Sequence, residues 1–281
     1  MKKFICIISI LCMLLCTVGC KPLNTEQVAI DGKLHIYYLD VGNADSIFIK
    51  LPDGKTMLID AGEKESGGKI VNYLKNAGVQ SIDYLVATHP HADHIGGMVD
   101  VINAFEIRNV YMTNAVNNTK TFENMLIALD AEGCPVTQAK AGVEILSDDN
   151  LSAVFVAPNS DEYEDLNNYS AVIKLTYGNN SFVFAGDAEK KAEDEIRTNI
   201  KCDVLKVGHH GSNTSTTKNF LKKTEPTYAI ISCAQENDYN HPHDKVLKRL
   251  EEAGVIVYRT DINGTIEVVS DGNNIEIHTE R

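Results

Sequence analysis

The chain has 281 residues, of which 43% are hydrophobic and 23% are charged. This length and composition are typical of about one large globular domain with a real hydrophobic core. The formal net charge of −13 excludes attraction of polyanions through the overall field of the protein, so binding of nucleic acid would require a local basic patch or bound cations.

The first twenty residues have the pattern of a secretory leader. Lys2 and Lys3 form a basic start, and the apolar run 4–15 is too short to span a membrane as a stable helix. Residues 17–20 (TVGC) resemble a bacterial lipobox, although Thr17 stands where Leu is usual. This pattern predicts an exported protein.

We therefore expect three parts in the chain. Residues 1–20 would form a lipoprotein signal peptide, residues 21–32 a polar tether, and residues 33–281 the folded domain. Cys20 would carry the lipid and hold the protein on the outer face of the bacterial cytoplasmic membrane. The alternative is a plain signal peptide cut nearby, which predicts the same export without the anchor.

Three cysteines besides Cys20 remain after such processing, namely Cys134, Cys202 and Cys233. Three cysteines cannot form a disulfide framework. We expect them to be small buried apolar side chains, with a single disulfide as the alternative.

The predicted elements form two β-rich halves, each followed by helices. In the first half we expect strands at 34–39, 45–50, 56–59, 84–88 and 108–112, and helices at 66–77, 95–105 and 120–132. In the second half we expect strands at 152–157, 170–176, 181–186, 203–207, 228–232, 255–259, 264–269 and 273–279, and helices at 188–198, 215–223 and 243–253. This order predicts a mixed α/β fold, a four-layer αββα sandwich with two sheets face to face and helices outside.

Seven of the nine histidines fall into three clusters. The first cluster places His89, His91, Asp93 and His94 between a predicted strand and a predicted helix. Three imidazoles and one carboxylate within six residues suit a divalent transition metal ion. A histidine-rich surface loop is the alternative, and the spacing argues against it.

The second cluster is His209-His210, and the third contains His241 and His243. Adjacent residues on an extended segment point in opposite directions, so we expect only one of His209 and His210 to bind metal. His241 and His243 are candidates for protonating a leaving group or contacting a phosphate, because the pKa of imidazole lies near working pH. Surface imidazoles at a helix N-terminus are the alternative for this pair.

The C-terminal third offers two further features. Ser212 and Asn213 could donate hydrogen bonds to a phosphate, or they could cap the next helix. Basic residues also concentrate here and weakly indicate a path for a polyanion: Lys201, Lys206, Lys218, Lys222, Lys223, Lys245, Lys248 and Arg249.

The HxHxDH pattern of residues 89–94 resembles the signature of the metallo-β-lactamase superfamily, and the resemblance extends over roughly residues 33–281. It implies that His89 and His91 hold one metal ion, that Asp93 and His94 hold another, and that Asp187 bridges the two. Asp93 would also orient the attacking water.

The same resemblance assigns further residues around the ions. Asp60, in LIDAG, would orient a ligand from outside the coordination sphere. Either His209 or His210 would be the late histidine of the second ion. The family's mid-chain histidine is absent, and Asn167 and Asn168 stand in that region. An amide oxygen is a poor ligand for such a metal, so one or two divalent ions, Zn²⁺ or Mn²⁺, are both possible.

Several segments resemble one branch of the superfamily, the extracellular hydrolase domain of ComEC-type competence proteins. These are residues 39–46 (LDVGNADS), 167–170 (NNYS), 184–188 (FAGDA), 205–212 (LKVGHHGS) and 240–243 (NHPH). The resemblance implies hydrolysis of phosphodiester bonds, those of DNA, by a water molecule activated on the metal. In that branch membrane-spanning channel segments accompany the domain, whereas no apolar stretch after residue 20 approaches ~20 residues, so we expect that the chain does not form a channel itself; the sequence leaves a separate channel partner open.

Two other functions compete with this one. The same fold could carry an esterase that acts on cell-wall phosphocholine or on small esters and lactones. Alternatively, the chain could be a lipoprotein that binds without catalysis, although an intact metal motif argues against that. The sequence does not indicate the oligomeric state.

Overall fold

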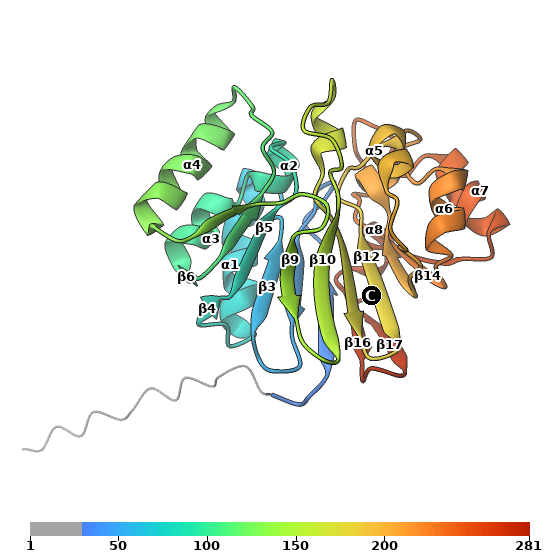
Figure 1. The fold of residues 1–281 in the computed structure, drawn as a ribbon, viewed down its shortest axis with the longest axis horizontal. Coiled ribbons are helices and arrows are strands. Elements are labelled where there is room, and N and C mark those ends of the chain that lie inside the picture. Colours follow the sequence, from blue (N-terminus) through green and yellow to red (C-terminus); the bar gives the residue numbers. More distant parts are fainter. Residues whose placement is uncertain (1–29) are drawn as a thin grey trace, which may run out of the picture.

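Two β-sheets form the centre of the computed structural model, which describes residues 30–281 (Figure 1). The first sheet contains, in order, β17 (Ile275–Thr279), β16 (Ile266–Ser270), β1 (Leu34–Tyr38), β2 (Ile47–Lys50), β3 (Thr56–Ile59), β5 (Tyr84–Ala87), β7 (Val110–Met112) and β8 (Val136–Gln138). The second contains β15 (Ile256–Arg259), β14 (Tyr228–Ile231), β13 (Val204–Lys206), β12 (Asn180–Phe184), β11 (Val172–Tyr177), β10 (Leu151–Ala157) and β9 (Glu144–Ser147). A small third sheet pairs β4 (Ser81–Ile82) with β6 (Glu106–Ile107).

Helices cover the outer face of each sheet (Figure 1). On the first sheet lie α1 (Gly67–Asn76), α3 (Met98–Ala104) and α4 (Lys120–Glu132). On the second lie α5 (Lys190–Glu195), α6 (Lys218–Thr224) and α7 (Asp244–Glu252). The αββα sandwich predicted from the sequence is therefore confirmed.

Three apolar cores correspond to the three interfaces between these four layers. On β2, Ile47 and Ile49 point into the core between the sheets, whereas Phe48 between them packs toward the helices. On β12, Phe182 and Phe184 enter the central core, and Val183 packs toward the outer helices. Side chains alternate between the two faces of a strand. A strand that is buried on both faces therefore has apolar residues at successive positions in the sequence.

The last two strands return to the first sheet. β16 pairs antiparallel with β1, with Ile36 opposite Val268, and β17 pairs with β16. β15, which precedes them, belongs to the second sheet and runs parallel to β14. The division of the sequence into two halves did not predict this exchange.

The predicted helix 95–105 corresponds to α3 (Met98–Ala104), which begins three residues later because a separate short helix precedes it. α2 (Ala92–Ile95) ends before Gly96, and α3 begins after Gly97. A Cβ atom at Gly96 would collide with the backbone of Lys64 and Ala92, and one at Gly97 with the carbonyl oxygen of Ala61. The two glycines thus allow this turn to pack directly against the segment after β3.

Other differences are smaller. The predicted elements end within three residues of the observed ones. β8 and β9 were not predicted; the three residues of β8 are all exposed, so their sequence carries no apolar pattern. Short helices also occur at η1 (Lys64–Ser66), η2 (Leu166–Tyr169), η3 (Gly208–Gly211) and α8 (Thr260–Asn263).

The expected signal peptide 1–20, with Cys20, lies outside the described residues, as does most of the expected tether. Within residues 30–281, no helix combines the length and apolar character needed to cross a membrane. Cys202 and Cys233 are buried, Cys134 is half-buried, and all three are free thiols.

Candidate metal centre

The site lies at one edge of the sandwich, where strands from both sheets end. The HxHxDH segment follows β5, Asp187 follows β12, and the two adjacent histidines follow β13. Parallel strands bring their carboxyl ends to the same edge, and β3 with β5 and β12 with β13 are parallel pairs. Sheet topology therefore collects these distant segments of the chain.

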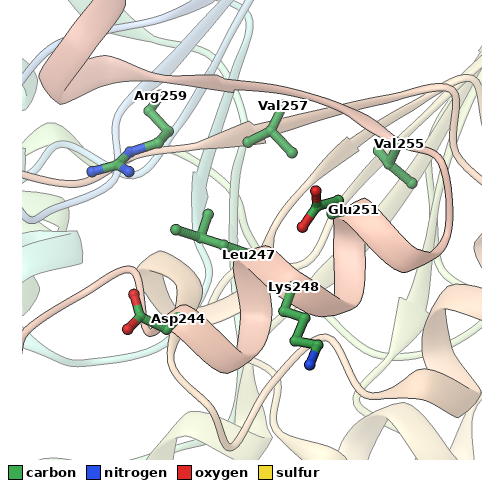
Figure 2. A pocket seen from close by; sticks show the side chains of 7 residues that line it. All are labelled: Asp244, Leu247, Lys248, Glu251, Val255, Val257 and Arg259. Atoms are coloured by element: carbon green, nitrogen blue, oxygen red, sulfur yellow. The ribbon is translucent and has the colours of Figure 1, made fainter.

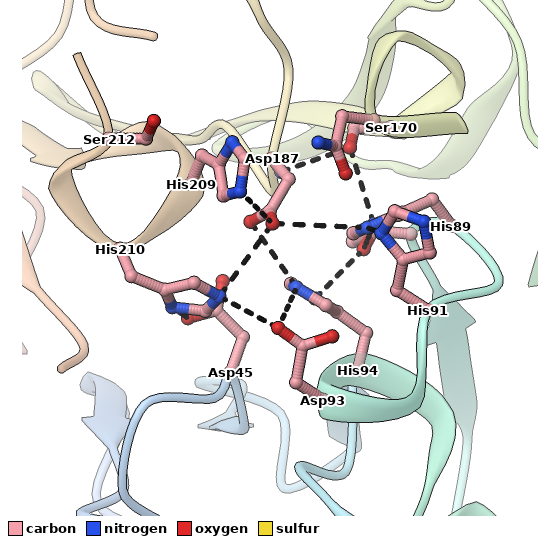
Figure 3. Close-up of polar contacts among 12 residues, drawn as sticks. Asp45, His89, His91, Asp93, His94, Ser170, Asp187, His209, His210 and Ser212 are labelled. Atoms are coloured by element: carbon pink, nitrogen blue, oxygen red, sulfur yellow. Dashed lines mark hydrogen bonds and ion pairs between the residues drawn. The ribbon is translucent and has the colours of Figure 1, made fainter. Parts of the chain in front are cut away.

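Four side chains from three of these loops converge on one point. Asp93, His94, Asp187 and His210 each offer a ligand atom, and all four atoms lie within 4.8 Å of one another. Nε2 of His94 lies 3.3 Å from Oδ1 of Asp187, and Nε2 of His210 lies 3.3 Å from Oδ2 of Asp93 (Figure 3). We refer to these four residues as the His/Asp cluster.

The His/Asp cluster fits a divalent metal ion. Nε2 of His94, Nε2 of His210 and Oδ1 of Asp187 are buried, and none of them has a hydrogen-bond partner among the described residues. Buried polar atoms without partners are rare, because each costs the free energy of its desolvation. Two imidazoles and two carboxylates are a suitable donor set for Zn²⁺ or Mn²⁺.

His89 and His91 lie beside the cluster. Nε2 of His89 is 3.9 Å from Oδ2 of Asp187 and 3.0 Å from Nδ1 of His91. Their ring nitrogens hydrogen-bond each other, so they fit a metal ion less clearly than the cluster does. Asp187 stands between the two groups, where it could bridge two ions.

Asp60 supports His94 from behind. Oδ2 of Asp60 lies 2.7 Å from Nδ1 of His94 and accepts a hydrogen bond from the hydroxyl of Thr88 at 2.7 Å. Its other oxygen accepts the backbone N–H of Thr88 at 2.8 Å. A carboxylate that accepts a hydrogen bond from Nδ1–H keeps the proton on that nitrogen and leaves Nε2 of His94 free for a metal ion.

The charges of the site act strongly on one another. Burial opposes the charged form of His94, yet Asp187 and Asp60 outweigh it and hold the pKa of His94 well above its usual value. Burial likewise opposes ionisation of Asp187, but His94 and His210 keep its pKa well below the usual range. The carboxylates thus attract positive charge to this position, which a metal ion would supply.

His209 and His210 do not lie on an extended segment, which was the premise for choosing between them, and only His210 offers a ligand atom to the His/Asp cluster. Both have left-handed backbone angles, with φ of 50°. His210 joins the cluster, and His209 lies farther out, with Nε2 at 3.6 Å from Asp187 and Nδ1 at 3.5 Å from Glu189. Burial lowers the pKa of His209, but Glu189 and Asp187 raise it above the usual value overall.

His241 and His243 line the same edge. The ring of His241 lies 5.4 Å from that of His209 and 4.9 Å from that of His243. Burial, followed by the nearby His209 and His210, lowers the pKa of His241 to about 4. His241 is therefore neutral at neutral pH, which argues against a role as proton donor. His243 is the N-cap residue of α7, and its Nδ1 accepts the backbone N–H of Asn213 at 2.9 Å.

Ser212 and Asn213 do not cap α6, because Thr217 does so by accepting from the backbone N–H of Phe220. The hydroxyl of Ser212 lies 2.9 Å from that of Thr214. Asn213 accepts a hydrogen bond from Arg249 at 3.2 Å. Both residues therefore stabilise the loop that follows the histidines.

The two mid-chain asparagines have different positions. Oδ1 of Asn168 accepts the backbone N–H of Ala192 and so fixes α5, whereas Oδ1 of Asn167 is buried without a hydrogen-bond partner. The neighbouring Ser170 was missed: its hydroxyl accepts the backbone N–H of Asp187 at 3.0 Å and lies 3.4 Å from Nδ1 of His89. The NNYS segment was the signal that could have identified it.

Four of the basic residues of the C-terminal third have partners within the protein. Lys206 is fully buried and pairs with Asp45, so its inclusion was wrong. Lys201 pairs with Glu225, and Lys218 pairs with Glu252. Arg249 donates to the carbonyl oxygens of the loop before α6.

Two large cavities differ in their relation to the His/Asp cluster. One of about 630 Å³ lies between α7 and β15, and no residue of the His/Asp cluster lines it (Figure 2). Another, of about 580 Å³, reaches Asp93. We call it the acidic cleft, because its walls carry Glu63, Glu65, Glu236 and Asp238 besides Tyr239.

Comparisons with known proteins agree with this architecture. The Metallo-beta-lactamase superfamily model matches residues 39–235. ComE operon protein 3 of Bacillus subtilis is 34% identical over 82% of this chain and 32% of its own length. Recombination protein 2 of Haemophilus influenzae is 32% identical over 86% of this chain and 30% of its own. The chain thus spans about a third of the length of these curated relatives.

A solved structure shows the same fold. The metallo-beta-lactamase fold protein YhfI from Bacillus subtilis superposes with a TM-score of 0.56 over 88% of this chain and 100% of its own. Its sequence identity is 12%, so this likeness concerns the fold alone.

Proposed function

The chain belongs to the metallo-beta-lactamase superfamily and has its metal-dependent hydrolase fold, and from this premise we propose that it hydrolyses phosphodiester bonds, with DNA as the substrate. The observation that carries the proposal is the His/Asp cluster, whose three unpartnered buried atoms converge where a cation would bind. The name of one relative, Recombination protein 2, supports DNA as the substrate class.

Some residues would bind the metal ions directly, and others position these ligands. Asp93, His94, Asp187 and His210 would hold one ion, and His89 and His91 would hold a second ion with Asp187. Bound divalent ions supply a water of lowered pKa and positive charge beside the phosphate oxygens. Asp60 fixes the ring of His94, and Ser170 links His89 to the backbone of Asp187.

His209 is the better candidate for proton donation to the leaving oxygen. Its ring lies between Asp187 and Glu189, and Glu189, which would hold no ion, favours its protonated form. His241 and His243 would contact the phosphate by hydrogen bonds. This division follows from where the carboxylates lie, because Asp187 and Glu189 flank His209, whereas the ring of His241 is surrounded by other imidazoles.

The loss of activity on replacement of His209 should depend on the leaving group of the substrate. We expect His209→Ala to lower kcat for DNA by about 10²-fold or more, the usual contribution of general acid catalysis. The same variant should lose far less with bis-p-nitrophenyl phosphate, because nitrophenolate departs without a proton. Steady-state kinetics with both substrates test this, and equal losses would show that His209 does not donate the proton.

Cleavage of DNA by the purified protein tests the proposed function. The protein is incubated with single- and double-stranded DNA in Mn²⁺, Zn²⁺ or EDTA, alongside His91→Ala. Metal-dependent cutting that disappears in the variant supports a nuclease. Intact metal binding without cutting of DNA or of bis-p-nitrophenyl phosphate would refute phosphodiester hydrolysis.

The acidic cleft favours a second candidate. Its carboxylates repel a polyanion, and in the described chain no Lys or Arg lines it. Tyr239, 67% exposed, could contact a quaternary ammonium group through its ring. This combination suits a phosphocholine ester, so p-nitrophenyl phosphorylcholine belongs in the same assay. Turnover of this ester with no cutting of DNA would favour the second candidate.

We further propose that the protein acts outside the cytoplasmic membrane, held by a lipid on Cys20 beside a separate channel partner. Cys20→Ser should release the protein from the membrane fraction, because a single residue carries the lipid. Fractionation and metabolic labelling with a fatty acid measure this. Label that persists in Cys20→Ser, or that is absent from the wild-type protein, would contradict a lipid anchor at Cys20.

A further inference from the structure

A buried ion pair lies directly behind the His/Asp cluster. Nζ of Lys206 is 2.8 Å from Oδ2 of Asp45, and the two side chains are 0% and 2% exposed. Lys206 is the last residue of β13, and Asp45 lies in the loop between β1 and β2. Burying two charges is costly, and replacing such a pair by apolar residues often stabilises a protein. Stability alone is therefore a weak reason for this pair.

Asp45 faces a member of the cluster with its other oxygen. Oδ1 of Asp45 is buried, has no hydrogen-bond partner among the described residues, and lies 3.6 Å from Nδ1 of His210. The carbonyl oxygen of Ser232 lies 3.1 Å from the same nitrogen. Nδ1 of His210 thus has the carbonyl oxygen of Ser232 as its hydrogen-bond acceptor and the carboxylate of Asp45 beside it, whereas Nδ1 of His94 has the carboxylate of Asp60.

The backbone of Asp45 also joins the loops of the site. Its N–H donates to the carbonyl oxygen of Asp93 at 3.2 Å, and its carbonyl oxygen accepts the N–H of Gly62 at 2.8 Å. Nζ of Lys206 donates to the carbonyl oxygen of Val207 at 2.9 Å, next to the turn that carries His210. The pair therefore connects the segments that supply Asp93, His94 and His210.

We propose that Asp45 is a positioning residue that keeps the proton of His210 on Nδ1 and its Nε2 directed at the cluster, and that Lys206 holds Asp45 in this role. This inference rests on the proposed metal site. Lys206 has a second effect. Asp45, Asp60 and His94 also offer ligand atoms within 4.8 Å of one another. The ion pair with the ammonium group of Lys206 engages the carboxylate of Asp45, and this keeps Asp45 from competing with the His/Asp cluster for the ion.

A charge-neutral double variant tests the proposal. Asp45→Asn with Lys206→Met removes both charges, so no buried charge is left unpaired and the metal-free protein should unfold near the wild-type temperature. Affinity for Zn²⁺, measured by titration calorimetry, should fall about 10- to 100-fold, as for other residues that orient a ligand. Wild-type affinity in the folded double variant would overturn the proposal.

A surface pair provides the matched control. Lys201 and Glu225 lie 2.8 Å apart and are both exposed. Lys201→Met with Glu225→Gln should change neither the unfolding temperature nor the affinity for Zn²⁺ appreciably. Since calorimetry measures metal binding without any substrate, failure of DNA cleavage leaves this test unaffected.

Should the double variant not fold, NMR of ¹⁵N-histidine in the wild-type protein with Zn²⁺ gives the answer. The signals of His210 are assigned by their loss in His210→Gln. A proton on Nδ1 with the metal on Nε2 supports the proposal. A proton on Nε2, or a metal ion on Nδ1, overturns it.

Discussion

Asp187→Ala should abolish metal-dependent turnover while the protein remains folded. The carboxylate of Asp187 lies within 4 Å of ring nitrogens of four histidines: His89, His94, His209 and His210. Its removal takes a ligand from the cluster and the candidate bridge from the second group. We expect kcat/KM to fall by more than the ~10²-fold typical of a change outside the coordination sphere.

Kinetics with bis-p-nitrophenyl phosphate and metal analysis of the purified variant measure this effect. Glu276→Ala on β17 is a suitable control, because this carboxylate is exposed and lies on the last strand of the first sheet. Wild-type turnover in Asp187→Ala would refute the assignment of the metal site, whatever the substrate.

Removal of metal should lower the unfolding temperature substantially. An ion that binds only the folded state, at about 1,000 times its dissociation constant, adds about 4 kcal/mol to the free energy of unfolding. For a domain of this size, that corresponds to roughly 8–16 °C. Thermal unfolding with Zn²⁺ and with EDTA measures the difference, and coincident curves would exclude a tightly bound ion.

The stabilisation by metal should also decrease as the pH falls. The pKa of His94 is raised well above its usual value of 6.5, because Asp187 and Asp60 outweigh the effect of burial. Protonation of His94 therefore stabilises the metal-free fold below pH 6.5, and this contribution is lost as the pH rises through the raised pKa. A metal ion must displace that proton, so the difference between Zn²⁺ and EDTA should be larger at pH 8 than at pH 6.

The sequence predicted those features whose cause is local. The spacing of His89, His91, Asp93 and His94 identified a metal motif, since these residues lie together in the chain. Apolar runs on both halves predicted strands buried on two faces. The αββα sandwich followed from the order of these elements.

Features that depend on tertiary contacts could not be predicted in the same way. His209 and His210 both have left-handed backbone angles, a conformation that no local sequence pattern predicts for histidine, so the directions of their side chains could not be inferred from an extended segment. Lys206 was taken as a surface lysine, because the partner that buries it, Asp45, lies in a distant loop. The turn at Gly96 was missed, because the segment that packs against it follows β3.

The return of β16 to the first sheet has a consequence for the order of assembly. β1 lies between β2 and β16, and the loop that carries Asp45 begins at the end of β1. During biosynthesis β16 emerges long after β1 and β2, beside which it completes the sheet. A chain that crosses a membrane unfolded can therefore finish this part of the sheet only after β16 has been delivered. Under the export proposed above, the ion would be captured in the compartment of arrival, and the metal supply there, rather than that of the cytosol, would decide which ion is bound.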